Sequence, residues 1–251
     1  SNQNDPYRQN ITSSLNSGPI ITSRESESAL SEIAYPTGAV IGAAHPLLLK
    51  KDNYYYLYYN RIITPSYYVK DVYPNSLIRG DKLYGRFGKD GVSLCVARAE
   101  CYKVTASNYT SLSNPWKKYW SWNFSEDGIG GLSTPLFDKD DGLPHEGYLV
   151  PVSVMDHTGL NEFLYVFMNP STYNRPYNRM YLCLSSLKDP CWIQNCIEVP
   201  LPSSNTWVSG MVSTDGYGSK GSGHYMKIYA HDRYGGLPGF HMSKYTLYLD
   251  Y

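Results

Sequence analysis

Along much of this chain, apolar and polar residues alternate, or apolar and aromatic residues form short unbroken runs. The longest aromatic runs lie at residues 54–59, 163–167 and 245–251. Clusters of Gly, Pro, Asn, Asp and Ser separate these runs, which is typical of β-strands joined by turns and loops. Helical spacing is nearly absent, and only residues 25–33 would suit a short helix. The pattern therefore predicts an all-β protein.

The strand-like runs repeat in three similar units. Each unit has a short apolar run, a turn, an aromatic run and a further strand that carries small residues. The units comprise residues 39–49, 54–60 and 92–98; residues 148–154, 162–169 and 180–186; and residues 207–213, 224–230 and 240–243. The repetition indicates a fold built from similar groups of strands.

Length and polarity set the expected domain organisation. A chain of 251 residues is long enough to bury a core of its own. The first 20 residues are polar and are expected to form an N-terminal arm, and residues 21–251 are expected to form a single β domain. We expect a compact antiparallel β-barrel or sandwich with long loops, with a β-propeller as the alternative.

Tyrosine is the most distinctive feature of the composition, with 26 Tyr against 6 Phe. A tyrosine has a rigid apolar body and a polar tip, which suits contacts with sugars and protein loops. We therefore expect tyrosines that point outward to contact a glycan or a protein receptor.

Charge and hydrophobicity argue against several classes of partner. The 22 Lys and Arg balance the 22 Asp and Glu, so the basic excess typical of nucleic-acid binding is missing. No apolar stretch is long enough for a membrane-spanning helix, and we expect no membrane insertion. The near-zero net charge is compatible with association into a homo-oligomer.

The five cysteines leave at least one thiol without a partner in the chain. Cys95 could pair with Cys101, and two of Cys183, Cys191 and Cys196 could pair with each other. The alternative is that all of them are buried, reduced and inert. There is no Cys-x-x-Cys pair and no suitably spaced histidine pair, so we expect neither zinc nor another metal.

Three Asn-x-Ser/Thr sequons begin at Asn10, Asn108 and Asn123. They are possible sites of N-glycosylation and permit an extracellular protein without requiring one.

Some segments resemble five-bladed β-propeller glycosidases of the arabinanase and β-xylosidase type. The resemblance lies in a proline followed by an apolar strand, a turn and a Tyr-rich strand, with a tryptophan later. The two segments are residues 46–59, followed by Pro115-Trp116, and residues 151–167, followed by Trp192. The resemblance implies a propeller that hydrolyses glycosides with an Asp base and a Glu acid.

The chain departs from that family where the catalytic base is expected. The family commonly places an Asp-Pro step at the start of its first blade, whereas this chain has His45-Pro46. If the chain is an enzyme, Glu146, Asp156 and Asp215 are the candidate catalytic residues. All three are better explained as ordinary turn or surface carboxylates, because acidic residues are common in turns, and a non-catalytic protein is therefore favoured over an enzyme.

The chain also resembles, in overall character, the projecting spike domains of small non-enveloped virus capsids such as astroviruses. These domains are compact, Tyr-rich β-barrels of about this length, but no single motif carries the resemblance. It implies a domain on the surface of a virion that attaches to a receptor.

Two short motifs have simpler explanations than a cofactor or metal site. The Gly-rich segment 216–221 has the spelling of a dinucleotide-binding loop, but a strand-like run follows it, so a surface loop carrying Tyr217 is favoured. The acidic run 138–142 lacks the later ligands of a calcium loop. We therefore expect no cofactor.

Aromatic residues provide the remaining candidates for a binding surface. Trp116, Trp120 and Trp122 lie close together, and Trp120 and Trp122 would share one face of a strand. That face would be either part of a core or a platform for a sugar ring.

We hypothesise an extracellular or particle-surface recognition domain, most concretely a viral attachment domain, with Tyr217, Trp120, Trp122 and His45 as ligand-binding candidates. The alternatives are a propeller glycoside hydrolase and a structural assembly subunit.

Overall fold

The structure is a computed structural model of the 251-residue chain. It describes residues 21, 40–64, 92–104, 114–120, 122–129, 133–137, 149–169, 178–185, 188–203, 206–213, 220–221, 223–232 and 241–250. The N-terminal arm expected at residues 1–20 lies outside this part of the chain.

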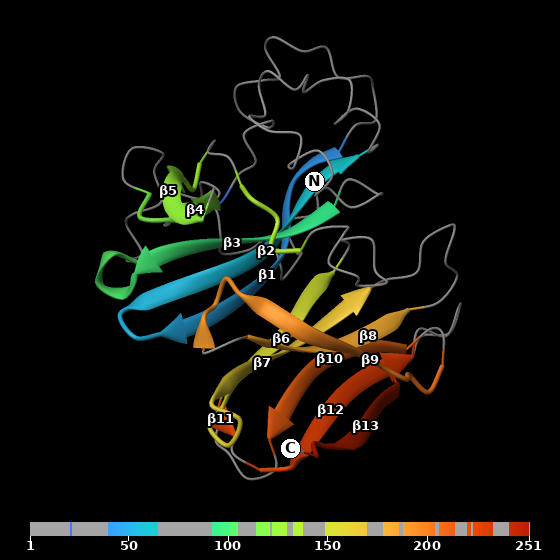
Figure 1. The fold of residues 1–251 in the computed structure, drawn as a ribbon. Coiled ribbons are helices and arrows are strands. Elements are labelled where there is room, and N and C mark those ends of the chain that lie inside the picture. Colours follow the sequence, from blue (N-terminus) through green and yellow to red (C-terminus); the bar gives the residue numbers. More distant parts are fainter. Residues whose placement is uncertain are drawn as a thin grey trace, which may run out of the picture.

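The described residues form three β-sheets, and the all-β prediction is confirmed (Figure 1). The first sheet has the order β1-β2-β3-β4-β5, with β1 (Val40–Lys51), β2 (Tyr54–Thr64), β3 (Val92–Glu100), β4 (Lys117–Trp120) and β5 (Asn123–Asp127). A short 3-10 helix, η4 (Cys101–Lys103), follows β3.

The second sheet has the order β11-β6-β7-β8-β9. Its strands are β6 (Val150–His157), β7 (Glu162–Asn169), β8 (Arg179–Ser185), β9 (Ile193–Val199) and β11 (Lys220–Gly221). The third sheet has the order β10-β12-β13, with β10 (Thr206–Ser213), β12 (Tyr225–Asp232) and β13 (His241–Tyr248). Neighbouring strands are antiparallel except for β11, which pairs parallel with β6.

The three units found in the sequence are confirmed as three antiparallel meanders. They correspond to β1-β2-β3, β6-β7-β8 and β10-β12-β13. Within each unit the neighbouring strands pair antiparallel, although residues 65–91 separate β2 from β3, and β11 of the second sheet lies between β10 and β12 in the sequence.

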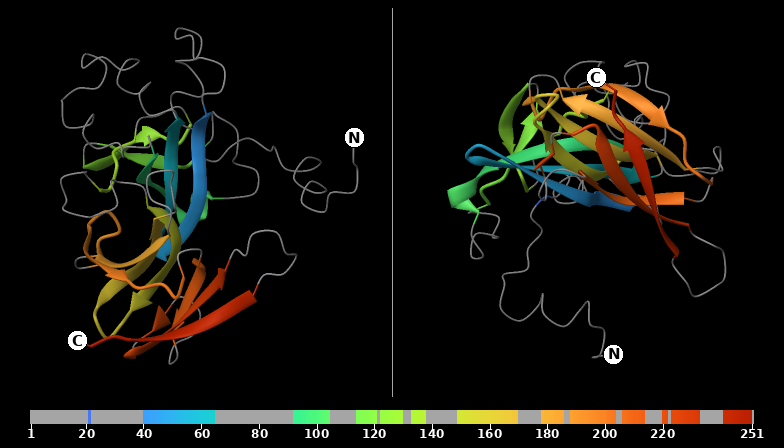
Figure 2. Two further views of the ribbon diagram at one scale, coloured as in Figure 1. Left: turned by 90° about the vertical axis from the view of Figure 1, so that its right-hand side faces the viewer. Right: turned by 90° about the horizontal axis from the view of Figure 1, so that it is seen from below.

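The second sheet lies between the other two, and Figure 2 shows the same order from a second direction. One hydrophobic core joins the first and second sheets and includes Tyr58, Leu94 and Phe167. Another core joins the second and third sheets and includes Val166 and Ile228. The described sheets close into neither a barrel nor a propeller, so the sandwich form of the fold prediction is the one that fits.

Several tyrosines of the β2 run are buried rather than exposed, contrary to the expectation that they point outward. Tyr56 and Tyr58 belong to the core between the first and second sheets, and Tyr59 belongs to a third cluster that includes Leu57, Cys95 and Trp116. The Tyr58 hydroxyl donates to the carbonyl oxygen of Pro190 at 2.8 Å and is hydrogen-bonded to the Tyr165 hydroxyl at 2.7 Å. Burial is tolerated because a phenol fills apolar space while its hydroxyl finds a partner.

Candidate ligand-binding groove

Two exposed tryptophans flank a groove between the turn that joins β4 to β5 and the segment that precedes β9. Trp122 is 71% exposed and Trp192 is 56% exposed. The groove has a volume of about 330 Å³ and is lined by these two residues and by Leu136, Phe137, Cys191, Ile193, Gln194 and Asn195. Single exposed apolar side chains are common, but two indoles that line the same concave apolar surface make it a candidate binding site.

Turn geometry places the first tryptophan at the groove. Trp120 pairs with Asn123 across the β4–β5 hairpin, so Trp122 belongs to the connection and not to a strand. Its φ of 73° is in the left-handed region, which non-glycine residues seldom adopt. The prediction that Trp120 and Trp122 share one face of a strand is therefore wrong. The Trp122 ring stands edge-on to Tyr119, with the ring centres 6.5 Å apart.

A compact turn places the second tryptophan. The Asp189 carboxylate accepts a hydrogen bond from the Cys191 backbone N–H at 2.8 Å. The Asp189 carbonyl accepts one from the Trp192 N–H at 3.1 Å. The Trp192 indole Nε1–H then donates to the Gln194 side-chain oxygen at 2.9 Å. These bonds fix the indole of Trp192 beside the amide of Gln194.

A β-bulge and a disulfide shape the wall that carries the amides. On β8, Leu182 pairs with Ile197 and Leu184 pairs with Gln194, so β9 has one residue more than β8 in this stretch. Within the bulge Asn195 has a φ of 51°. Cys183 and Cys196 form a disulfide here.

The disulfide confirms one of the two local pairings expected from the sequence. The other is wrong, because Cys95 and Cys101 are both free. Cys95 is fully buried in β3, and burial raises the pKa of its thiol to about 12.

Among the described residues that line the groove, most are apolar or aromatic and none carries a charged side chain. Leu136, Phe137 and Ile193 supply hydrocarbon and aromatic surface, and Gln194 and Asn195 supply amide donors and acceptors. Desolvation raises the pKa of the Cys191 thiol to about 12, so this thiol is neutral and a poor nucleophile. The chemistry suits non-covalent binding of an uncharged ligand with an apolar face and hydrogen-bonding groups.

The nearby cation Arg98 is already held by aromatic rings. Its guanidinium carbon lies 4.4 Å from the centre of the Tyr54 ring and 4.3 Å from the centre of the Phe124 ring. Such cation–π contacts stabilise a charge in a partly apolar setting. Arg98 therefore supports the β4–β5 hairpin that carries Trp122, and it is not among the groove's lining residues.

His45 and Trp120, two of the sequence-predicted ligand-binding residues, do not line the groove. His45 has a φ of 53° in an irregularity of β1, and its Nδ1 donates to Asn60 Oδ1 at 3.0 Å. Asn60 in turn donates to the Leu149 carbonyl at 2.7 Å, which links β2 to the segment before β6. Trp120 is partly buried at the end of β4. Tyr217 lies outside the described residues.

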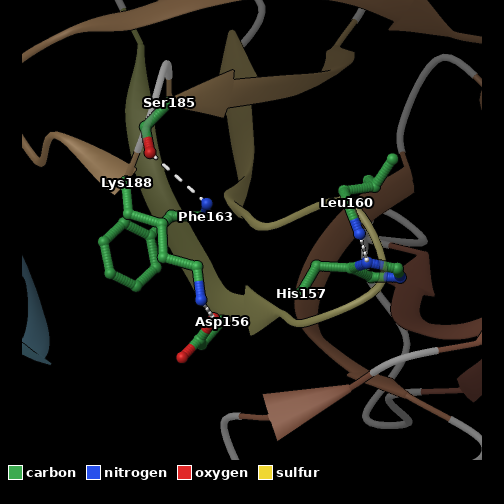
Figure 3. A network of polar contacts seen from close by, with 6 residues as sticks. All are labelled: Asp156, His157, Leu160, Phe163, Ser185 and Lys188. Atoms are coloured by element: carbon green, nitrogen blue, oxygen red, sulfur yellow. Dashed lines mark hydrogen bonds and ion pairs between the residues drawn. The ribbon is translucent and has the colours of Figure 1, made fainter.

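Of the three candidate catalytic residues, the structure describes only Asp156, since Glu146 and Asp215 lie outside the described part. Asp156 forms an ion pair with Lys188, whose ammonium group is 2.6 Å from its carboxylate oxygen and lies over the Phe163 ring (Figure 3). This arrangement links β6 to the segment after β8 and gives Asp156 a structural role.

The neighbouring His157 also serves the backbone. It is fully buried, accepts a hydrogen bond from the Leu160 N–H at Nδ1 and donates from Nε2 to the Gly223 carbonyl. Figure 3 shows the side chains of Asp156 and His157 with separate partners. This contact pattern ties the β6–β7 turn to the segment before β12.

Trp192 is the groove residue that sequence reasoning missed as a binding candidate. The available signal was an Asp-Pro step at residues 189–190, with a tryptophan two residues after the proline. Such a turn places the next residues at the surface. What the sequence could not show is that this surface meets the β4–β5 turn, 70 residues earlier (192 − 122 = 70).

Comparison of the chain with protein-family models, with curated proteins and with solved structures finds no match. Among the described residues, no group of three or more His, Cys, Asp or Glu side chains could hold a metal ion. The part of the chain with assigned structure also contains no helix with the length and hydrophobicity needed to cross a membrane.

Proposed function

We propose that this chain is an extracellular or particle-surface recognition domain, and that the groove between Trp122 and Trp192 binds a glycan. A viral attachment domain is the most concrete form of the proposal. The observation that carries it is the pair of exposed indoles over an apolar base, with two amides on one wall. Indole faces stack on the CH groups of a sugar ring, and amides bond to its hydroxyls.

The composition of the groove favours binding over hydrolysis. Glycoside hydrolysis requires two carboxyl groups on either side of the scissile bond. The described lining residues include neither Asp nor Glu, and Asp156 forms an ion pair with Lys188. The disulfide between Cys183 and Cys196 supports an oxidising environment, such as the cell exterior.

The proposal predicts that Trp192→Ala weakens glycan binding. The purified domain is applied to an array of neutral and acidic oligosaccharides, and the strongest binder is then titrated against both proteins. If stacking on the indole contributes about 1.4 kcal/mol to the binding free energy, its removal lowers the affinity roughly tenfold. Neutral sugars are expected to dominate, because the described residues that line the groove include no cation to pair with an acidic sugar.

Tyr102→Ala is the matched control. Tyr102 is 74% exposed, close to the value for Trp122, but it lies in η4 and does not line the groove. Its replacement should leave the array pattern and the affinity unchanged. If no oligosaccharide binds, or if Trp192→Ala binds as well as the unmodified chain, the groove is not a glycan site.

A further inference from the structure

One of the three sequons lies within the described residues, and it lies beside the groove. Asn123-Phe124-Ser125 opens strand β5, directly after Trp122. The sequons at Asn10 and Asn108 lie outside the described part. A sequon can carry a glycan in the folded protein only where its asparagine faces solvent, because the attached sugar is bulky and hydrophilic.

The strand geometry presents this sequon to solvent. Strand β5 is an edge of the first sheet, and its exposure alternates along the strand. Asn123 and Ser125 face solvent, whereas Phe124 turns inward against Tyr56 and Tyr119, with ring centres 5.8 and 5.2 Å away. The amide and the hydroxyl that the modification requires therefore lie on one accessible face.

The hydrogen bond of Asn123 is also compatible with a glycan. Its Oδ1 accepts a hydrogen bond from the Phe124 backbone N–H at 2.8 Å. A sugar is attached to the other side-chain atom, Nδ2, so this bond survives the modification. The hairpin can therefore keep its conformation when the asparagine is glycosylated.

A second observation, independent of the sequon, concerns the compartment. Cys183 is fully buried and forms its disulfide with Cys196. Disulfides form in oxidising compartments such as the lumen of the endoplasmic reticulum. N-glycans are added to chains in that same compartment, so a chain that acquires this disulfide there is also exposed to the modification.

We propose that Asn123 is an N-glycosylation site and that its glycan stands at the rim of the groove beside Trp122. The donor is an oligosaccharide linked to a lipid diphosphate. The asparagine Nδ2 forms a bond to C1 of the first N-acetylglucosamine and loses one proton. The C1–O bond to the diphosphate breaks, and its electron pair leaves with the lipid diphosphate.

The test is site-resolved mass spectrometry of the chain secreted from mammalian cells. Treatment with peptide-N-glycosidase F in heavy-oxygen water converts a glycosylated asparagine to a labelled aspartate, which distinguishes residue 123 from residues 10 and 108. Labelling at residue 123 in most molecules is expected. Recovery of residue 123 as unlabelled asparagine in the secreted, disulfide-bonded protein would overturn the proposal.

Matched variants separate the modification from damage to the fold. Asn123→Gln and Ser125→Ala should each remove the glycan from this position, whereas Ser125→Thr should keep it because threonine also completes a sequon. All three should be secreted at similar levels, since both side chains face solvent. If the label at residue 123 were lost in Ser125→Thr as well as in Ser125→Ala, recognition of this site as an Asn-x-Ser/Thr sequon would be contradicted.

A separate experiment tests whether the glycan lies beside Trp122, and its result does not depend on the proposed function of the groove. Oxidation of Trp122 by N-bromosuccinimide, followed by peptide mapping, should be severalfold slower in the glycosylated chain than in Asn123→Gln. Equal rates in the two proteins would place the glycan away from the groove.

Discussion

At the scale of single residues, several tyrosines are buried with their hydroxyls hydrogen-bonded, whereas two exposed tryptophans border the groove. The Tyr58 and Tyr165 hydroxyls form a hydrogen bond between the first and second sheets. The Tyr59 hydroxyl is hydrogen-bonded to Ser133 Oγ at 2.6 Å. Burial raises the pKa of the Tyr58, Tyr59 and Tyr165 phenols, because a phenolate would lose its hydration. The exposed aromatic surface of the groove comes from tryptophan instead.

Tyr58→Phe is expected to lower the free energy of unfolding at neutral pH by about 1–3 kcal/mol, because Pro190 and Tyr165 lose a buried hydrogen-bond partner.

The same buried phenol makes the free energy of unfolding depend on pH in the alkaline range. The folded state binds its proton more tightly than the unfolded state, so stability is full below the ordinary tyrosine pKa of about 10 and falls above it. When the free energy of unfolding is measured with urea between pH 8 and 11, it should fall less steeply with pH in Tyr58→Phe than in the unmodified chain.

Tyr248→Phe provides the control, because Tyr248 is exposed on β13. Its change in unfolding free energy should stay within about 0.5 kcal/mol, and its alkaline profile should match that of the unmodified chain. A Tyr58→Phe variant as stable as the original, with an unchanged pH profile, would contradict the role given to this hydroxyl.

At the scale of elements, the β8–β9 pair shows how an irregularity builds one wall of the groove. The bulge in β9 lies between Gln194 and Ile197, and the disulfide to Cys183 lies within it. A bulge bends its strand and re-aims its side chains. Gln194 and Asn195 therefore line the groove at the point where the bulge interrupts the regular pairing of β8 with β9.

Replacing both disulfide partners, as Cys183→Ala/Cys196→Ala, should lower the free energy of unfolding by about 2–4 kcal/mol. The reason is that the cross-link restricts the unfolded chain, here across 13 residues. Urea denaturation of the two oxidised proteins measures the difference. Cys101→Ala serves as the control, because Cys101 is free and only partly buried. If the double variant and the control were equally stable, the disulfide would not contribute to stability.

At the scale of the whole molecule, the second sheet belongs to both cores. On β7, Tyr165 and Phe167 belong to the core shared with the first sheet, whereas Leu164, Val166 and Met168 belong to the core shared with the third. Adjacent side chains of a strand point to opposite faces, so a strand buried on both faces must be apolar throughout. The unbroken run at residues 163–167 has this explanation.

The shared sheet predicts that the cores unfold together. Phe167→Ala in one core should destabilise the protein by about 3–5 kcal/mol, and Met226→Ala in the other by about 2–5 kcal/mol. Both should shift a single thermal transition, followed by tryptophan fluorescence and by far-ultraviolet circular dichroism. Separate transitions for the two probes would show that the sheets unfold independently.

Much of the fold could be predicted from local pattern, whereas little of the groove could. The three meanders follow from runs and turns that are close in sequence, such as β6 and β7 at residues 150–169. Trp122 was identified as an aromatic candidate, but its position in a turn depends on the pairing of Trp120 with Asn123. His45 was chosen for its place in a motif, and its hydrogen bond to Asn60 shows a structural role.

The sequence by itself determined the strand content and the grouping of the strands into three similar units, because periodicity and turn residues act locally. It left open whether any of the later cysteines pair, and the structure shows the disulfide between Cys183 and Cys196. Only the tertiary structure decided which tyrosines are buried, that one sheet lies between the other two, and that Trp192 faces the turn of Trp122. These features depend on packing between sheets, and a sheet's choice of partner is set by the combined fit of many side chains and not by any one segment.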